Sequence, residues 1–250
     1  MRYSKLTYKT KAKKPYLFIG SKVRGALGYT LKEEVCINPS YKCAGCFALK
    51  KCVFFKMYEE QNITHKYRLD IKLDDKEYKF SLLLFDELIQ YEEAIHSAVM
   101  KSLHPLPVKH KTKIKKIKEK KKHIKLLKLS LVTPLRIKQK NRFATKDISV
   151  IEILNSIKRR YSDLQNKEYK KEIFKEPEII SKHLYFQDLI RRSDKQKTKM
   201  NMGGLMGEMI LKDIDAEVYK ILKIGEVTGV GKSTVFGLGK IKVKIIEGEE

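Results

Sequence analysis

The sequence predicts an α+β protein built from two tandem ferredoxin-like βαββαβ domains, with a glycine-rich loop near its C-terminus. The order strand, helix, hairpin, helix, strand occurs twice along the chain, and this is the split βαβ order. A length of 250 residues is enough for two small domains. Hydrophobic residues make up 42% of the chain, which excludes a disordered protein. We therefore expect one domain at 1–125, with a cysteine-rich insert at 36–52, and a second at 126–250, with the glycine-rich loop at 225–239.

The spacing of apolar residues predicts the elements of the first half. Leu6 and Tyr8 alternate with basic residues, as in a short strand with a cationic solvent face. The second helix must stop before Pro105, which cannot continue it. The elements are a strand over 2–14 ended by Pro15, a helix from Ile19 to about Val35, a hairpin over 67–84 that turns at Asp74 and Asp75, and a helix from Tyr91 to about His104.

The second half repeats this order after a lysine-rich stretch. Residues 109–128 hold eleven lysines and one acid, and their apolar positions suit a helix as well as a strand. Asp147 is placed to cap the helix that follows, and Gly225 to end the last helix. The elements are a strand over 127–131, a helix over 151–164, strands over 183–190 and 206–211, a helix over 214–223 and a strand over 241–246.

The charge of the chain indicates a polyanionic partner. Lys and Arg number 55 against 30 Asp and Glu, so the net charge is +25. Nucleic acid is the simplest partner for such a surface, while an anionic membrane surface or charge that only keeps the protein in solution stay open. No run of about 18 apolar residues occurs, and the N-terminus lacks the apolar block of a signal peptide. We therefore expect a cytoplasmic protein that is not bound to a membrane.

The cysteines form one local cluster. All four lie between Cys36 and Cys52, which suits metal binding in a reducing compartment better than a disulfide framework. Four thiolates could hold a structural zinc ion, whereas reduced core cysteines or an iron–sulfur cluster are the alternatives. The candidate ligands are Cys36, Cys43, Cys46 and Cys52.

The C-terminal run GEVTGVGKSTVFGLGK resembles a P-loop only in part. Gly231, Lys232 and Ser233 match the end of that pattern, but the position of its first glycine is Glu226. The glycines instead supply a backbone that can approach an anion closely, with Lys232 and Lys240 beside it. A glycine-rich loop that merely packs against a helix is the alternative.

Three blocks of the chain form a recognisable set: VRGALGYTL with the cysteines after it (23–52), LSLVTPLRIK (129–138), and RRSDKQKTKMNMGGLMGE running on to GEVTGVGKSTVFGLGK (191–240). They resemble the RAMP superfamily of CRISPR proteins, and in particular the endoribonucleases that cut precursor CRISPR RNA within its repeats. The resemblance implies metal-independent cleavage, in which a ribose 2′-hydroxyl attacks the adjacent phosphate to leave a 2′,3′-cyclic phosphate and a 5′-hydroxyl. No cofactor is needed for that chemistry. A RAMP subunit that only holds the guide RNA is the alternative function.

The resemblance also implies where the catalytic groups lie. Family members often keep them on or near the first helix, where this chain has no histidine. Lys22 and Tyr29 are then the candidates there, while Arg24 either contacts RNA or only braces the fold. On the predicted strand His183 shares a face with Tyr185, so His183 is a third candidate, with a structural histidine as the alternative.

The expected partner is CRISPR repeat RNA, with other CRISPR effector proteins as further candidates. Cations and glycine backbone in the third block would contact the RNA backbone without reading its bases. The RNA-binding candidates are Arg24, Arg191, Arg192, Lys195, Lys197, Lys199, Gly229, Gly231, Lys232, Gly237 and Gly239.

Overall fold

A computed structural model describes residues 1–250 except 14–17, 74, 118–121, 194–197 and 248–250, and leaves out the side chains of 192–193 and 198–199. The chain divides into two compact units, Met1–Lys116 and Ile117–Glu250. Each unit is described by itself. The boundary expected after residue 125 lies inside a strand, β5 (Ile124–Leu135).

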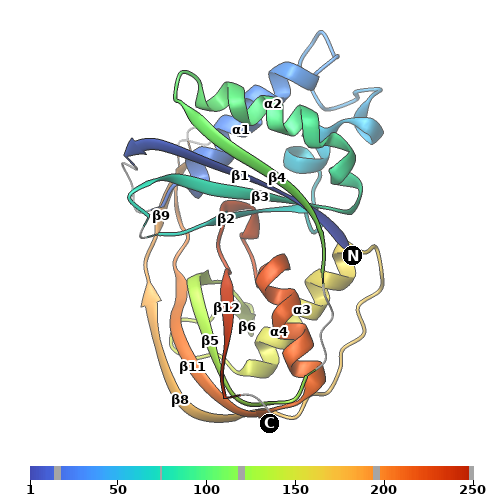
Figure 1. Ribbon diagram of the computed structural model, residues 1–250. Helices are drawn as coiled ribbons and strands as arrows, with labels where there is room; N and C mark the ends of the chain where they lie inside the picture. Colours follow the sequence, from blue (N-terminus) through green and yellow to red (C-terminus); the bar gives the residue numbers. More distant parts are fainter. Residues whose placement is uncertain (14–17, 74, 118–121, 194–197, 248–250) are drawn as a thin grey trace. The chain divides into compact units, whose positions relative to one another are not determined.

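The N-terminal unit is a four-stranded antiparallel sheet in the order β2-β3-β1-β4, with both helices on one face (Figure 1). This is the strand order of a ferredoxin-like domain. Leu6 and Tyr8 of β1 are buried, which confirms the predicted alternation. The elements are β1 (Arg2–Lys13), α1 (Gly20–Val35), β2 (Tyr67–Ile71), β3 (Glu77–Phe85), α2 (Glu92–Leu103) and β4 (Val108–Lys116), with short helical turns at Leu49–Lys51, Phe55–Glu59 and Asp86–Tyr91.

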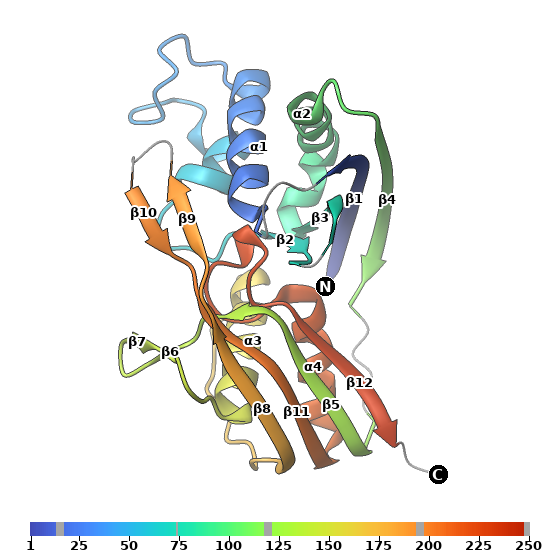
Figure 2. The ribbon, with the colours of Figure 1, turned by 90° about the vertical axis from the view of Figure 1, so that its left-hand side faces the viewer.

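The C-terminal unit repeats this arrangement in the order β12-β5-β11-β8, and helices α3 and α4 lie on one face of the sheet (Figure 2). Leu127, Leu129 and Leu131 of β5 are buried on the helix side. The elements are β5, β6 (Lys138–Gln139), β7 (Arg142–Phe143), α3 (Val150–Leu164), β8 (Glu178–Gln187), β9 (Ile190–Ser193), β10 (Thr198–Asn201), β11 (Gly204–Ile214), α4 (Ala216–Thr228) and β12 (Ile241–Glu247). The tandem ferredoxin-like prediction is confirmed.

The structure decides how the lysine-rich stretch folds. Residues 108–116 form β4, an edge strand paired with β1 without a register shift. The next strand, β5, begins at Ile124. Residues 118–121 of the lysine-rich stretch lie outside the described part of the chain. The strand alternative is therefore correct for the described part of the stretch. No helix among the described residues is long and apolar enough to span a membrane.

The predicted caps of both helices in the C-terminal unit were wrong. The cap of α3 is Ser149, whose side chain accepts from the amide of Glu152 while the Glu152 carboxylate accepts from the Ser149 amide. This reciprocal capping box satisfies two amides at once, whereas the Asp147 carboxylate accepts from the amide of its neighbour Ile148 and pairs with the Lys182 side chain. Gly225 lies inside α4, and the helix runs on to Thr228.

Packing explains the longer helix. A Cβ on Gly225 would lie 2.5 Å from Ile157 of α3 and 2.9 Å from Ile241 of β12. The glycine therefore allows α4 to approach its neighbours closely and does not end it. The helix stops four residues later, at Gly229, whose positive φ of 77° suits glycine.

Candidate nucleic-acid interface

The glycine loop, residues 229–240, is built by backbone contacts. Gly239 has φ of 67°, and a Cβ there would lie 1.8 Å from the Val230 oxygen. Gly231 has φ of 74°, and its Cβ would lie 2.5 Å from the Arg136 oxygen. Both positions need glycine because a side chain is excluded by sterics and by the backbone conformation. The loop therefore has one packed conformation.

The amides of the glycines are used inside the protein. Gly229, Gly231, Gly237 and Gly239 donate to Gly225, Ser156, Thr234 and Pro134, and Lys232 donates to Arg136. The expectation that glycine amides offer themselves to a phosphate was wrong, because these donors already have partners. The loop's amides without a donated bond inside the described structure are those of Ser233, Thr234 and Val235. Among its side chains Lys232 is exposed.

Two residues of the LSLVTPLRIK block hold this loop. The buried Thr133 hydroxyl donates to the Gly237 oxygen at 3.0 Å and accepts from the Lys240 amide at 2.9 Å. Arg136 lies with its guanidinium 4.2 Å from the centre of the Phe143 ring and donates to the Gly203 oxygen at 2.7 Å. Burial lowers the pKa of Arg136. Sequence reasoning quoted this block but missed both residues, since nothing local marks a threonine or arginine as a partner of a loop about a hundred residues away.

Arg191 is brought to the same loop. Its guanidinium lies 4.5 Å from the centre of the Phe236 ring, and its Nη1 is 3.9 Å from the sulfur of Met200 on the paired strand. The β9–β10 hairpin and the glycine loop thus meet through one cation–π contact. Phe236 was not a candidate from the sequence. The other predicted cations of this turn cannot be placed, because Lys195 and Lys197, and the side chains of Arg192 and Lys199, lie outside the described residues.

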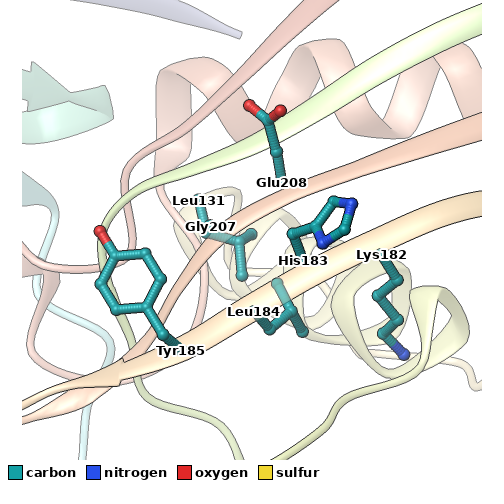
Figure 3. Close-up of a pocket in the computed structure, with 7 residues that line it drawn as sticks. All are labelled: Leu131, Lys182, His183, Leu184, Tyr185, Gly207 and Glu208. Carbon is teal, nitrogen blue, oxygen red and sulfur yellow. The ribbon is translucent and has the colours of Figure 1, made fainter.

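His183 lies on the sheet face opposite α3 and α4. It pairs across the strands with Glu208, and Lys182 next to it points away to bind Asp147 and the Ile148 oxygen (Figure 3). His183 and Tyr185 line a shallow depression of about 600 Å³ together with Glu208. Both are exposed, and Glu208 also pairs with Lys128 of β5. The predicted shared face of His183 and Tyr185 is confirmed.

On α1 the structure separates bracing from exposed residues. The Arg24 guanidinium lies 4.5 Å from the centre of the Tyr58 ring, and its Nε donates to the buried Tyr67 hydroxyl at 2.9 Å. A Cβ on Gly28 would lie 2.6 Å from the same Tyr58 ring. These contacts are those of a residue that braces the fold. Gly28 leaves space for the Tyr58 ring, which the Arg24 guanidinium covers.

Lys22 and Tyr29 lie seven residues apart, on one side of the helix, and both are exposed. The Tyr29 side chain is 70% exposed. A hydrogen bond to Glu33 raises the pKa of Tyr29, and Lys101, 3.2 Å from the Glu33 carboxylate, lowers the pKa of Glu33. The hydroxyl thus keeps its proton at neutral pH and can donate it.

The structure does not support the expected zinc site. Among the described residues, which include the whole 36–52 loop, no group of three or more His, Cys, Asp or Glu side chains is arranged to hold a metal ion. The Cys36 thiol donates to the Asn38 oxygen at 3.8 Å, and the Cys52 sulfur accepts from the Phe55 amide at 3.5 Å. All four are free, half-buried thiols, and burial raises the pKa of Cys43. The loop backbone therefore contacts two of the four sulfurs.

Residues 129–241 match the family model of the CRISPR-associated endoribonuclease Cas6. This range begins in β5 and ends just past the glycine loop. It includes the Thr133 hydroxyl and, directly after β5, the Arg136 backbone oxygen, which both bond to that loop. Over these residues the chain resembles the Cas6 family. A second family model, described as an N-terminal domain, matches residues 1–125. No curated protein matches the chain by sequence at a significant level.

Solved Cas6 structures share the fold over almost the whole chain. A Cas6 product complex is 15% identical with a TM-score of 0.64, covering 98% of this chain and 99% of that one. Thermus thermophilus Cas6 is 15% identical with a TM-score of 0.58, covering 97% and 98%. A Cas6 substrate mimic complex is 14% identical with a TM-score of 0.54, covering 98% and 100%. At these identities the similarity establishes the tandem ferredoxin-like fold.

Proposed function

We propose that this chain cleaves precursor CRISPR RNA within its repeats, without a metal ion. The ribose 2′ oxygen forms a bond to the adjacent phosphorus while the bond from phosphorus to the 5′ oxygen breaks, which leaves a 2′,3′-cyclic phosphate and a 5′-hydroxyl. The observation that carries the proposal is the Cas6 match over residues 129–241. Similar Cas6 structures are product and substrate mimic complexes, which supports repeat RNA as the partner.

Tyr29 is proposed as the acid that protonates the leaving 5′ oxygen. Its hydroxyl is exposed on α1 and carries its proton at neutral pH, as tyrosine hydroxyls do. The hydrogen bond to Glu33 raises its pKa and so makes it a weaker acid, an effect that RNA displacing Glu33 would remove. Lys22, on the same side of α1, would stabilise the charge that grows on the phosphate oxygens. His183, in the C-terminal unit, is a separate candidate, as a base that takes the 2′ proton, since it is exposed beside Glu208. Lys22 and Tyr29 belong to the N-terminal unit, so each assignment stands by itself and is tested by itself.

The glycine loop is proposed to contact the RNA backbone through its unused donors. These are the amides of Ser233, Thr234 and Val235 and the exposed Lys232 side chain. Arg191 stacks on Phe236 of the loop and continues the cationic surface toward the β9–β10 hairpin. The proposed grip on an RNA stem adds Arg192, Lys195, Lys197 and Lys199 of that hairpin. Such contacts neutralise phosphates without reading sequence.

The decisive experiment incubates the full chain with its own repeat RNA in excess chelator, beside the same RNA with a 2′-deoxy sugar at the cut site. Cleavage of the first RNA alone supports 2′-hydroxyl attack. Cleavage of both contradicts it, because the deoxy strand has no nucleophile. Tight binding with no cleavage of either RNA would favour a RAMP subunit that only holds the guide RNA.

Single substitutions then assign the roles. Lys22→Ala, Tyr29→Phe and His183→Ala are each expected to slow cleavage by about 10²- to 10⁴-fold if the group takes part in proton transfer or charge stabilisation. Matched controls are Lys50→Ala, Tyr41→Phe and His104→Ala, whose side chains are also exposed. A group whose loss slows cleavage no more than its control is not catalytic.

A further inference from the structure

The described part of the lysine-rich stretch, which the proposed chemistry does not use, forms an ordered row on β4. The strand pairs with β1 in unbroken register from Arg2–Lys116 to Thr10–Val108. His110 faces α2, because its ring lies 4.5 Å from that of His96. Alternation along a strand then places the odd-numbered residues on the opposite face. The row consists of Lys109, Lys111, Lys113 and Lys115, all exposed.

The row is a regular line of like charge. Successive lysines of a strand on one face are spaced by about 6.7 Å. Lys113 lies directly opposite Lys5 of β1, and Lys109 lies opposite Lys9. The neighbouring lysines Lys111 and Lys115 lower the pKa of Lys113. Like charges directly opposite each other in a sheet are destabilising, so the unliganded sheet carries an electrostatic cost at this edge.

The β1 lysines opposite the row are paired with acids. Lys5 lies 3.1 Å from Asp70, and Lys9 lies 3.0 Å from Glu77. The other edge strand, β2, alternates signs, with Arg68 beside Asp70. By contrast, no carboxylate among the described residues pairs with any lysine of the row. The acids that pair with β1 therefore lie on β2 and β3 and leave the β4 row uncompensated.

Protection of a sheet edge against aggregation is a simpler role for edge lysines. That role is met by scattered charges of either sign, and β2 meets it with Arg68 and Asp70. It does not require four charges of one sign on one face. A bound polyanion would reduce the repulsion between the lysines of the row. Because the lysines follow one another along an extended strand, they suit a ligand that is itself extended.

We propose that the β4 lysine row binds the sugar–phosphate backbone of an extended, single-stranded RNA segment, without base recognition. The inference rests on the proposed RNA substrate and adds a second contact surface to it. Lysine side chains act as point charges toward phosphates and do not read base edges. The row contains no aromatic side chain on which an RNA base could stack. We therefore expect the contact to be independent of the RNA sequence.

The test compares two variants of the full chain that lose equal charge. The row variant carries Lys→Gln at residues 109, 111, 113 and 115, and the control variant carries Lys→Gln at residues 167, 170, 171 and 175, which are exposed and lie between α3 and β8. Binding of a polyuridine strand of repeat length is measured across a potassium chloride series. We expect the slope of log Kd against log salt to fall by up to about 3 in the row variant, and by less than about 1 in the control.

Equal slopes in the two variants would overturn the inference. Loss of binding to anionic phospholipid vesicles, with RNA binding unchanged, would also overturn it and assign the row to a membrane surface. Thermal melting at low salt checks folding, and Lys111→Gln with Lys113→Gln serves as a milder variant if the fourfold variant unfolds. Cleavage of repeat RNA by the unaltered protein is scored separately, so failure of the proposed cleavage leaves the salt slopes interpretable.

Discussion

The two units share one strand order, but the RGALG helix of the first and the glycine loop of the second are held in different ways. In the N-terminal unit the RGALG helix is held by side chains, since Arg24 bridges Tyr58 and Tyr67. In the C-terminal unit the glycine loop is held by its own backbone and by Thr133. In both, the residues that define the motif maintain the structure. The side chains that face solvent are their neighbours, such as Lys22 on the helix and Lys232 in the loop.

The largest effect is expected from Gly239→Ala. A Cβ would meet the Val230 oxygen at 1.8 Å in a left-handed backbone, so the loop must open. We expect a loss of about 3 kcal/mol or more in the free energy of unfolding, measured by urea denaturation. Gly25→Ala is the control, because its Cβ would meet nothing within 4 Å on a helix, and it should be neutral or stabilise by up to about 1 kcal/mol. Equal effects of the two would contradict the packed loop.

Arg24→Ala tests the side-chain bracing of the N-terminal unit. It removes the guanidinium that donates to the fully buried Tyr67 hydroxyl and uncovers the Tyr58 ring. We expect destabilisation of about 2 kcal/mol, because a buried hydroxyl loses one hydrogen bond and the Tyr58 ring loses packing. Lys22→Ala should leave thermal stability unchanged while slowing cleavage. If Arg24→Ala slows cleavage without lowering the melting temperature, Arg24 contacts RNA and does not brace the helix.

Thr133→Val tests the backbone bracing of the loop with little change in side-chain shape. It removes the bond to the Gly237 oxygen and the acceptor of the Lys240 amide. The expected cost is about 1–2 kcal/mol, with weaker RNA binding because the loop is less fixed. Thr112→Val, on the exposed β4, is the matched control and should change neither quantity. Hydrogen exchange of the loop amides would show whether the stability lost is local.

A smaller effect is expected on the pH dependence of stability, from His96 of the N-terminal unit. Burial and the neighbouring His110 lower the pKa of His96 from its ordinary value of 6.5, against the opposing effect of Glu92. Between the lowered value and 6.5 the unfolded chain binds more protons, so this group's contribution to stability is present above that window and is lost as pH falls through it. His96→Gln should flatten the decline by less than about 0.5 kcal/mol, since water screens this half-buried ring. The measurement is the free energy of unfolding at pH 7 and pH 5.

Local patterns were enough to predict the tandem fold. Alternation at Leu6 and Tyr8 and the stop before Pro105 depend only on neighbours in the chain, and the structure confirms them. The helix caps failed because the competing candidates lie close together. Asp147 and Ser149 are both good caps, and the choice depended on Glu152 completing a reciprocal pair.

The sequence by itself determined the order of the elements, the excess of positive charge and the resemblance to repeat-cleaving RAMP proteins, because these depend on composition and on spacing along the chain. Only the tertiary structure decided that Gly225 packs inside a helix, that Thr133 holds the glycine loop, and that Arg191 lies against Phe236 of that loop. Each of these outcomes depends on contacts between segments far apart in the chain. Such contacts form when the sheet and the helices pack together, and the spacing of apolar residues along the sequence does not predict them.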